Sequence, residues 1–171
     1  MTSHAAFSLH WMPPPEDFDA RLAALRDSDA EPADILKGLQ ALATARLDFM
    51  QTRKLDKLAG QFAGKLPPRV PRLRLALLGT STLEHLVPGI RVAALRRGLV
   101  VEAQVGPYGQ WRQQILDESS ELYAFKPHAI LLCLDQSSIL SELPLSSPDE
   151  EVDAAIDDAV QELVALWRMA R

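Results

Sequence analysis

The chain has 171 residues, 47% hydrophobic and 24% charged, a composition that suits a folded domain and excludes global disorder. Its net charge of −5 is uneven, because residues 69–111 carry six arginines and two glutamates whereas residues 112–171 carry 4 basic and 12 acidic groups. The acidic last third argues against a nucleic-acid partner, and the single cysteine, Cys133, excludes an internal disulfide and a cysteine-based zinc site.

The first 15 residues form a proline-rich leader with neither a basic start nor a long apolar stretch, so we expect no signal peptide. No later run reaches about 18 apolar residues, so we expect no membrane span. These two patterns favour a cytoplasmic location.

Helical patterns follow the leader. A short helix is predicted over residues 16–27, and Pro32 suits the first turn of a second helix that runs to about residue 58. Proline and glycine residues then end the pattern. We therefore predict two domains, a helical region over residues 1–66 and an α/β domain over residues 67–171.

Strands and helices alternate in the second domain. Apolar runs predict three buried strands, over residues 73–78, 99–105 and 128–134, the last of which holds a buried Cys133. The segments between them predict a helix over 82–97, kinked at Pro88 and closed by Gly98, and short helices over about 110–125.

A capping box over residues 147–150, with Pro148 at the first helical position, predicts a last helix to about residue 170. Its apolar stripe is expected to be buried and consists of Val152, Ile156, Val160, Leu163 and Trp167.

Apolar strands that alternate with helices predict an α/β fold with a three-layer parallel sheet, in strand order 2-1-3 as at the start of a flavodoxin-like fold. Three strands are few for this class, and the sequence stops after a helix, where a further strand would be due. We therefore expect a fragment of a longer protein with an incomplete sheet.

Ligands of such sheets bind beyond the carboxyl ends of the strands, at the switch point between strands 1 and 3. Three loops are expected to meet there, and we predict the following ligand-binding residues: Gly79, Thr80, Thr82, Gly106, Tyr108, Gly109 and Asp135. The histidines show no metal-ligand spacing and no nucleotide-binding motif is present, so we expect no metal and no cofactor.

We consider three roles for Ser81. It caps the helix through the capping box Ser81-Thr82-Leu83-Glu84, or contacts a ligand, or acts as a nucleophile. A nucleophile needs a base, and His85 lies one turn further along the same predicted helix. His128 opens a strand at the opposite end of the sheet.

Four segments together resemble one known family. They are Leu77-Leu78-Gly79-Thr80-Ser81-Thr82, the run from Gly98 to Val105, the run from Tyr108 to Asp117, and Leu122-Tyr123-Ala124-Phe125-Lys126-Pro127. They resemble the N-terminal region of FkbH-like proteins, the HAD subfamily IIIC proteins of polyketide and related pathways. The resemblance implies an SGNH-hydrolase-like domain followed by a HAD domain. It also implies a role in loading a glyceryl unit from a phosphorylated glycerate onto an acyl carrier protein.

The catalytic motifs implied by the resemblance are incomplete. Gly79-Thr80-Ser81 matches the SGNH motif Gly-Asp-Ser at two of its positions, and Gly106 or Gly109 could supply the oxyanion hole. Asp135 stands where that superfamily places an asparagine. The Asp-x-x-His block and the HAD motif Asp-x-Asp-x-Thr are both missing from these residues.

Three functions remain open. The first is a binding or docking module for an acyl carrier protein or its tethered acyl group, with Arg96 and Arg97 facing the acidic carrier. The second is a serine hydrolase or acyltransferase that uses Ser81. The third is a structural module that forms a homo-oligomer through the helical region 16–58.

Overall fold

The computed structural model describes residues 11–140, 143–144 and 146–170. The chain divides into two compact units, which we call the helical unit (Met1–Leu73 and His85–Glu102) and the sheet unit (Arg74–Glu84 and Ala103–Arg171).

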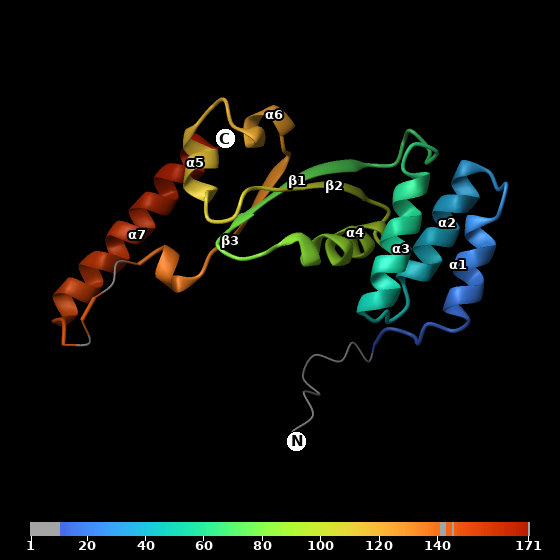
Figure 1. Ribbon diagram of the computed structural model, residues 1–171, viewed down its shortest axis with the longest axis horizontal. Coiled ribbons are helices and arrows are strands. Elements are labelled where there is room, and N and C mark those ends of the chain that lie inside the picture. The colour runs from blue at the N-terminus through green and yellow to red at the C-terminus, as the bar shows by residue number, and fades with distance from the viewer. Residues whose placement is uncertain (1–10, 141–142, 145, 171) are drawn as a thin grey trace, which may run out of the picture. The chain divides into compact units, whose positions relative to one another are not determined.

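A three-stranded sheet in the order β2-β1-β3 is formed by β1 (Arg72–Gly79), β2 (Val100–Val105) and β3 (Ala129–Cys133) (Figure 1). β1 and β3 are parallel, in a register from Leu75 opposite Ala129 to Gly79 opposite Cys133. The N–H of Val100 donates to the Pro71 carbonyl and that of Gly106 to the Leu77 carbonyl, so β2 also runs parallel to β1. The predicted α/β class and the strand order 2-1-3 are confirmed.

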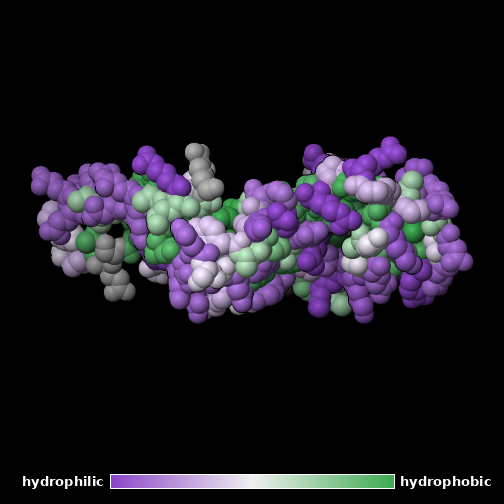
Figure 2. Space-filling view, turned by 90° about the horizontal axis from the view of Figure 1, so that it is seen from above, coloured by the Kyte–Doolittle hydropathy of each residue, from purple (hydrophilic) through white to green (hydrophobic). Residues whose placement is uncertain are grey.

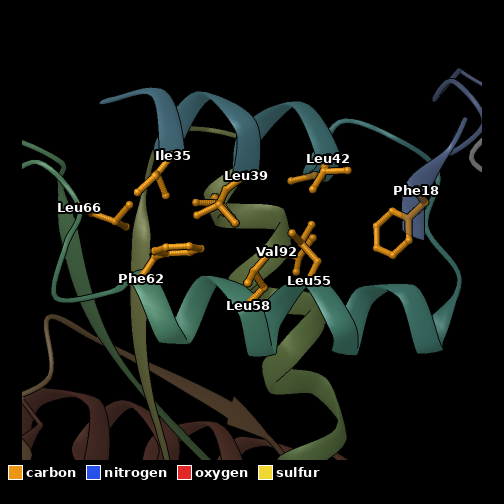
Figure 3. Close-up of a cluster of buried hydrophobic side chains, with 11 residues drawn as sticks. Phe18, Ile35, Leu39, Leu42, Leu55, Leu58, Phe62, Leu66 and Val92 are labelled. Carbon is orange, nitrogen blue, oxygen red and sulfur yellow. The ribbon is translucent and has the colours of Figure 1, made fainter. Parts of the chain in front are cut away.

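The helical unit contains α1 (Phe18–Arg26), α2 (Pro32–Ala43), α3 (Phe49–Phe62) and α4 (Val87–Leu95). Leucine, isoleucine and phenylalanine side chains from these helices point toward one another in a shared core (Figure 3). Leu39 of α2 and Leu55 of α3 are fully buried at its centre, and Val92 brings α4 into the same cluster. Burial of these apolar side chains stabilises the three N-terminal helices together with α4.

The single helix predicted from residue 32 to 58 is wrong, because α2 ends at Ala43 and α3 begins only at Phe49. Asp48 starts the new helix. Its carboxylate accepts from the Gln51 N–H at 2.8 Å, while the Gln51 side chain accepts from the Asp48 N–H at 3.0 Å. This reciprocal capping box stabilises a helix start in the middle of a continuous apolar pattern.

The helix expected over residues 82–97 is also shorter than predicted. A 3₁₀ turn, η2 (Glu84–Leu86), precedes α4, and Pro88 lies in the first turn of α4 instead of kinking it. Proline is tolerated there because the first-turn N–H groups have no partner within the helix. Gly98 takes the left-handed conformation expected after the helix, with φ of 75°.

The sheet unit contains α5 (Trp111–Leu116), α6 (Glu121–Phe125), η3 (Gln136–Ser138) and α7 (Asp149–Met169). One face of the sheet packs against α5, α6 and α7 around the fully buried Trp111. Arg112 of α5 also forms a two-pronged ion pair with Glu162 of α7, at 2.5 and 2.9 Å. No helix among the described residues is long and apolar enough to cross a membrane.

Two expectations about burial in the sheet unit are wrong. β3 is an edge strand and Cys133 is half-buried, with Leu131 still 40% exposed, because only β1 lies beside β3 among the described residues. On α7 the buried positions are Ala159 and Leu166, and Leu163 is partly buried. The other members of the predicted buried stripe are exposed: Val152, Ile156, Val160 and Trp167.

The predicted capping box at the start of α7 is wrong as well. α7 begins at Asp149, its N-cap residue is Pro148, and no side chain caps the helix. Proline therefore precedes the first helical residue, and Ser147 lies one position too early to cap.

Candidate functional site

The first strand ends in a bend whose position depends on Gly79. A Cβ atom at Gly79 would lie 2.4 Å from the Cys133 carbonyl oxygen and 3.1 Å from Leu83. The next residue, Thr80, donates its N–H to the same Cys133 carbonyl at 3.2 Å. Glycine thus allows β1 and β3 to stay in contact at the carboxyl end of the sheet.

The side chain of Thr80 joins the ends of β1 and β3. Its hydroxyl donates to Asp135 Oδ2 at 2.8 Å and accepts from the Asp135 N–H at 3.2 Å. The other oxygen, Asp135 Oδ1, accepts from the Ser137 hydroxyl at 2.8 Å and the Ser138 N–H at 2.9 Å, so Asp135 also caps η3. Two hydrogen bonds therefore hold Thr80 and Asp135 together although they are 55 positions apart, and the two serines fix the same carboxylate locally.

These donors stabilise the ionised form of Asp135. The Ser137 hydroxyl is the largest cause that lowers the pKa of this carboxyl below its usual value, followed by the Thr80 hydroxyl. The charge is exposed to solvent and opposes a negatively charged ligand at this edge. The Thr80 hydroxyl donates its one proton to the carboxylate and accepts from the backbone N–H of Asp135.

A third loop meets the first strand at the same edge. The N–H of Gly109 donates to the Gly79 carbonyl at 3.1 Å, and the N–H of Gly106 donates to the Leu77 carbonyl at 2.9 Å. Because both N–H groups already have carbonyl partners, neither is available in this arrangement to stabilise an oxyanion. Tyr108, between the two glycines, is exposed.

Ser81 lies in the bend between β1 and η2, and both Ser81 and Thr82 are exposed. Its side chain makes no hydrogen bond to the described residues, so the predicted helix cap is absent; the helical segment starts only at Glu84. The proposed base His85 lies in η2 and belongs to the helical unit, whereas Ser81 belongs to the sheet unit. A Ser81–His85 pair therefore stays a prediction.

His128 is engaged elsewhere, as expected from its place at the start of β3. Its Nδ1 accepts from the Arg74 N–H at 2.9 Å. In the described part of the chain, no cluster of three histidine, cysteine or acidic side chains could hold a metal ion.

The two arginines predicted to dock a carrier follow α4 in the helical unit. The guanidinium of Arg96 lies 5.3 Å from the Trp11 ring centroid, and its Nη1 is 3.2 Å from the Met12 sulfur. Arg97 is exposed. Arg96 thus has a structural role, whereas Arg97 is open to a partner.

The structure brings Gly79, Thr80, Gly109 and Asp135 together at one edge of the sheet. We did not predict that Ser137 and Ser138 donate to the carboxylate. The run Asp135-Gln136-Ser137-Ser138 could have indicated it, because an aspartate at an N-cap accepts from the backbone N–H two or three residues later. None of the predicted site residues lines the groove of about 880 Å³ that lies between β3 and α7.

The fold and these contacts define a parallel α/β domain whose loops at the carboxyl edge of the sheet are tied together around one carboxylate. The family model for the FkbH N-terminal domain matches residues 74–170, more than half of the chain. The chain belongs to this family.

Among solved structures, the chain is similar to the crystal structure of the N-terminal part of the protein BF1531 from Bacteroides fragilis, described as containing a phosphatase domain complexed with Mg. The two are 19% identical, with a TM-score of 0.47 over 77% of this chain. The chain spans 29% of that protein's crystallised length. No curated protein matches the chain.

Proposed function

We propose that this chain is a binding or docking module in the loading of a glyceryl or acyl unit onto an acyl carrier protein, without a complete active site of its own. Its membership of the FkbH N-terminal domain family supports the pathway. The parallel sheet in order 2-1-3 is compatible with an SGNH-hydrolase-like ancestry. The phosphate chemistry of the family belongs to a HAD domain, whose Asp-x-Asp-x-Thr motif is missing from these 171 residues.

The observation that carries the non-catalytic reading is the Thr80–Asp135 contact. A serine hydrolase needs donors around the developing oxyanion, but here an ionised carboxylate lies at the edge of the sheet next to the bend that holds Ser81. The glycine N–H groups of the third loop donate to carbonyl oxygens instead. The absence of free backbone donors in the third loop and the nearby carboxylate both speak against an oxyanion hole beside Ser81.

A fluorophosphonate probe tests the absence of a catalytic serine. The 171-residue protein and its Ser81→Ala variant are incubated with the probe, and labelled peptides are identified by mass spectrometry. We expect no labelling of Ser81 in the original protein and the same background labelling in both proteins. Labelling that disappears in Ser81→Ala would contradict the proposal and support a hydrolase or acyltransferase.

Carrier binding tests the docking role. We expect Arg97→Gln to weaken binding of an acyl carrier protein by about 1.4- to fivefold at low salt, the effect of one exposed charge pair of roughly 0.2–1 kcal/mol. Arg21→Gln is the matched control, because Arg21 is exposed on α1 and the change in charge is identical.

Fluorescence anisotropy with a labelled carrier measures both affinities. An equal loss in the two variants, or no loss in Arg97→Gln, would contradict a docking surface at the end of α4. Arg96→Gln is less informative, because it also removes the contacts with Trp11 and Met12.

A further inference from the structure

A short segment before α1, residues 11–13, lies on the helical unit beside the end of α4. Its central residue, Met12, is buried, with 7% of its surface exposed. The carbonyl of Pro13 accepts from the N–H of Arg46 at 2.8 Å, in the loop between α2 and α3. The segment therefore reaches from the end of α4 to this loop, and we call it the strap.

The strap covers Arg96, which directly follows α4. The Arg96 guanidinium carbon, Cζ, lies 5.3 Å from the centroid of the Trp11 ring, and Nη1 donates to the Met12 sulfur at 3.2 Å. Arg96 is half-buried, whereas its neighbour Arg97 is exposed. The two arginines therefore differ in how far a partner can reach them.

The acceptor that the strap offers to Arg96 is weak. A guanidinium carries five N–H donors, and a thioether sulfur is a poorer acceptor than a carboxylate oxygen. Between the described residues, no ion pair includes Arg96. A carboxylate from a partner would therefore bind this guanidinium more strongly than Met12 does.

Few bonds hold the strap in place. Among the described residues, its only backbone hydrogen bond to another part of the helical unit is the one from Arg46. The prolines at positions 13–15 have no N–H to donate, the Trp11 ring remains 70% exposed, and Met12 is not part of the buried cluster that forms the core. Segments with few backbone hydrogen bonds open locally without global unfolding. The strap can therefore leave Arg96 while the helical core stays folded.

We propose that the strap is a reversible cover that competes with an acidic partner for Arg96. This inference rests on the proposed docking of a carrier protein at the end of α4. Carboxylates of the carrier would replace the thioether as acceptors, and Arg96 would then bind the carrier beside Arg97.

The surface of the helical unit suits a partner that is recognised by charge. The unit carries 13 basic and 10 acidic residues, whereas the sheet unit is acidic. Figure 2 shows hydrophilic residues over most of the visible surface at the end of the molecule that carries α1, α2 and α3. Charged groups therefore dominate what an approaching carrier meets there, and covering one arginine lowers the attraction.

Chemical modification of arginine tests the cover without a carrier. p-Hydroxyphenylglyoxal reacts with accessible guanidinium groups, and tandem mass spectrometry separates modification of Arg96 from that of Arg97. In the original protein we expect Arg96 to react more slowly than Arg97. In Trp11→Ala the reaction of Arg96 should be about two- to fivefold faster, the factor that corresponds to the loss of one exposed cation–π contact.

Phe49→Ala is the matched control. Phe49 is an exposed aromatic residue of the same unit, and its ring lies 5.8 Å from the guanidinium of Arg53 instead of Arg96. The reaction rate of Arg96 should be the same in Phe49→Ala as in the original protein. Far-UV circular dichroism checks that both variants remain folded.

Carrier binding tests the competition. Fluorescence anisotropy with a labelled acyl carrier protein should show about two- to fivefold tighter binding to Trp11→Ala than to the original protein at low salt. Phe49→Ala should bind as the original protein does. In an Arg96→Gln background, Trp11→Ala should bring no gain, because the gain requires the uncovered guanidinium.

Two results would overturn the proposal. The first is an equal reaction rate of Arg96 in the original protein and in Trp11→Ala. The second is carrier binding that is unchanged or weaker in Trp11→Ala, which would make Trp11 a structural residue or part of the docking surface. If no variant binds the carrier, the proposed docking function fails, and the reaction rate of Arg96 by itself decides whether the strap covers it.

Discussion

Replacing Gly79 with alanine tests how the end of β1 is held against β3. The new Cβ would lie 2.4 Å from the Cys133 carbonyl oxygen, whereas an ordinary contact between such atoms needs well over 3 Å. The strands must therefore separate by about 1 Å, which stretches the Thr80 N–H bond to Cys133 beyond its present 3.2 Å and past hydrogen-bonding range. Overpacking costs about 1–3 kcal/mol and a lost hydrogen bond about 1 kcal/mol, so we expect a loss of about 3 kcal/mol.

For a chain of this length, a loss of about 3 kcal/mol lowers the melting temperature by roughly 6–12 °C. Urea and thermal denaturation, followed by far-UV circular dichroism and by tryptophan fluorescence, measure the change. The matched control is Gly60→Ala in α3, where a Cβ meets no atom within 4 Å and alanine should add about 0.5–1 kcal/mol. If the free energy of unfolding of Gly79→Ala lay within about 0.5 kcal/mol of that of the original protein, the close approach of β1 and β3 would be refuted.

Three further substitutions probe single side chains. Asp48→Ala should destabilise the helical unit by about 1 kcal/mol in thermal denaturation, because it removes the cap of α3; an unchanged melting temperature would contradict the capping role. Asp135 has a lowered pKa in the folded state, so its stabilising contribution is present above its unfolded pKa of about 4 and is lost as the pH falls through the folded value. The stability difference between the original protein and Asp135→Asn should therefore shrink in acid. Burial is the main cause that raises the pKa of Asp56, against an opposing effect of Arg91, so its contribution is present in acid and is lost as the pH rises through the folded value. Asp56→Asn should accordingly gain stability relative to the original protein as the pH rises from below about 4 to neutrality. Urea denaturation across that range measures the stability of Asp135→Asn and Asp56→Asn relative to the original protein. Shifts of the two variants in the same direction would contradict the opposite signs expected here.

The sheet was predictable because its signals are local. Each strand is a short apolar run between turn residues. Strands that are connected by helices pair in parallel, which predicts the arrangement seen here. Gly98 was recognised as the residue after a helix because glycine alone adopts its positive φ without strain.

The helix boundaries were less predictable, because two capping signals competed with the apolar pattern. The capping box at Asp48 lies inside a run with helical spacing, so periodicity alone joined two helices into one. The similar motif at Ser147 does not cap a helix, since α7 begins at Asp149, after the proline. A capping motif indicates where a helix can start, but packing of the surrounding segments selects one start.

The candidate site was predicted in its location and only partly in its chemistry. The strand order placed the loops after β1, β2 and β3 at one edge, which follows from the rule for parallel sheets. That Thr80 and Asp135 share two hydrogen bonds could not be read from residues 55 positions apart. The same carboxylate also accepts from the Ser137 hydroxyl and the Ser138 N–H, which short-range sequence patterns indicate only in part.

The sequence by itself determined the α/β class, the order of the strands and the family resemblance, because these depend on apolar periodicity and on short runs of neighbouring residues. Only the tertiary structure decided which apolar residues are buried. The stripe of α7 has the spacing of a buried face, yet Ala159 and Leu166 take the core positions while Val160 and Trp167 remain exposed. Hydrophobic spacing specifies that a helix has an apolar side; how far that side is covered depends on the neighbouring strands and helices, and beside β3 the described chain provides no such cover.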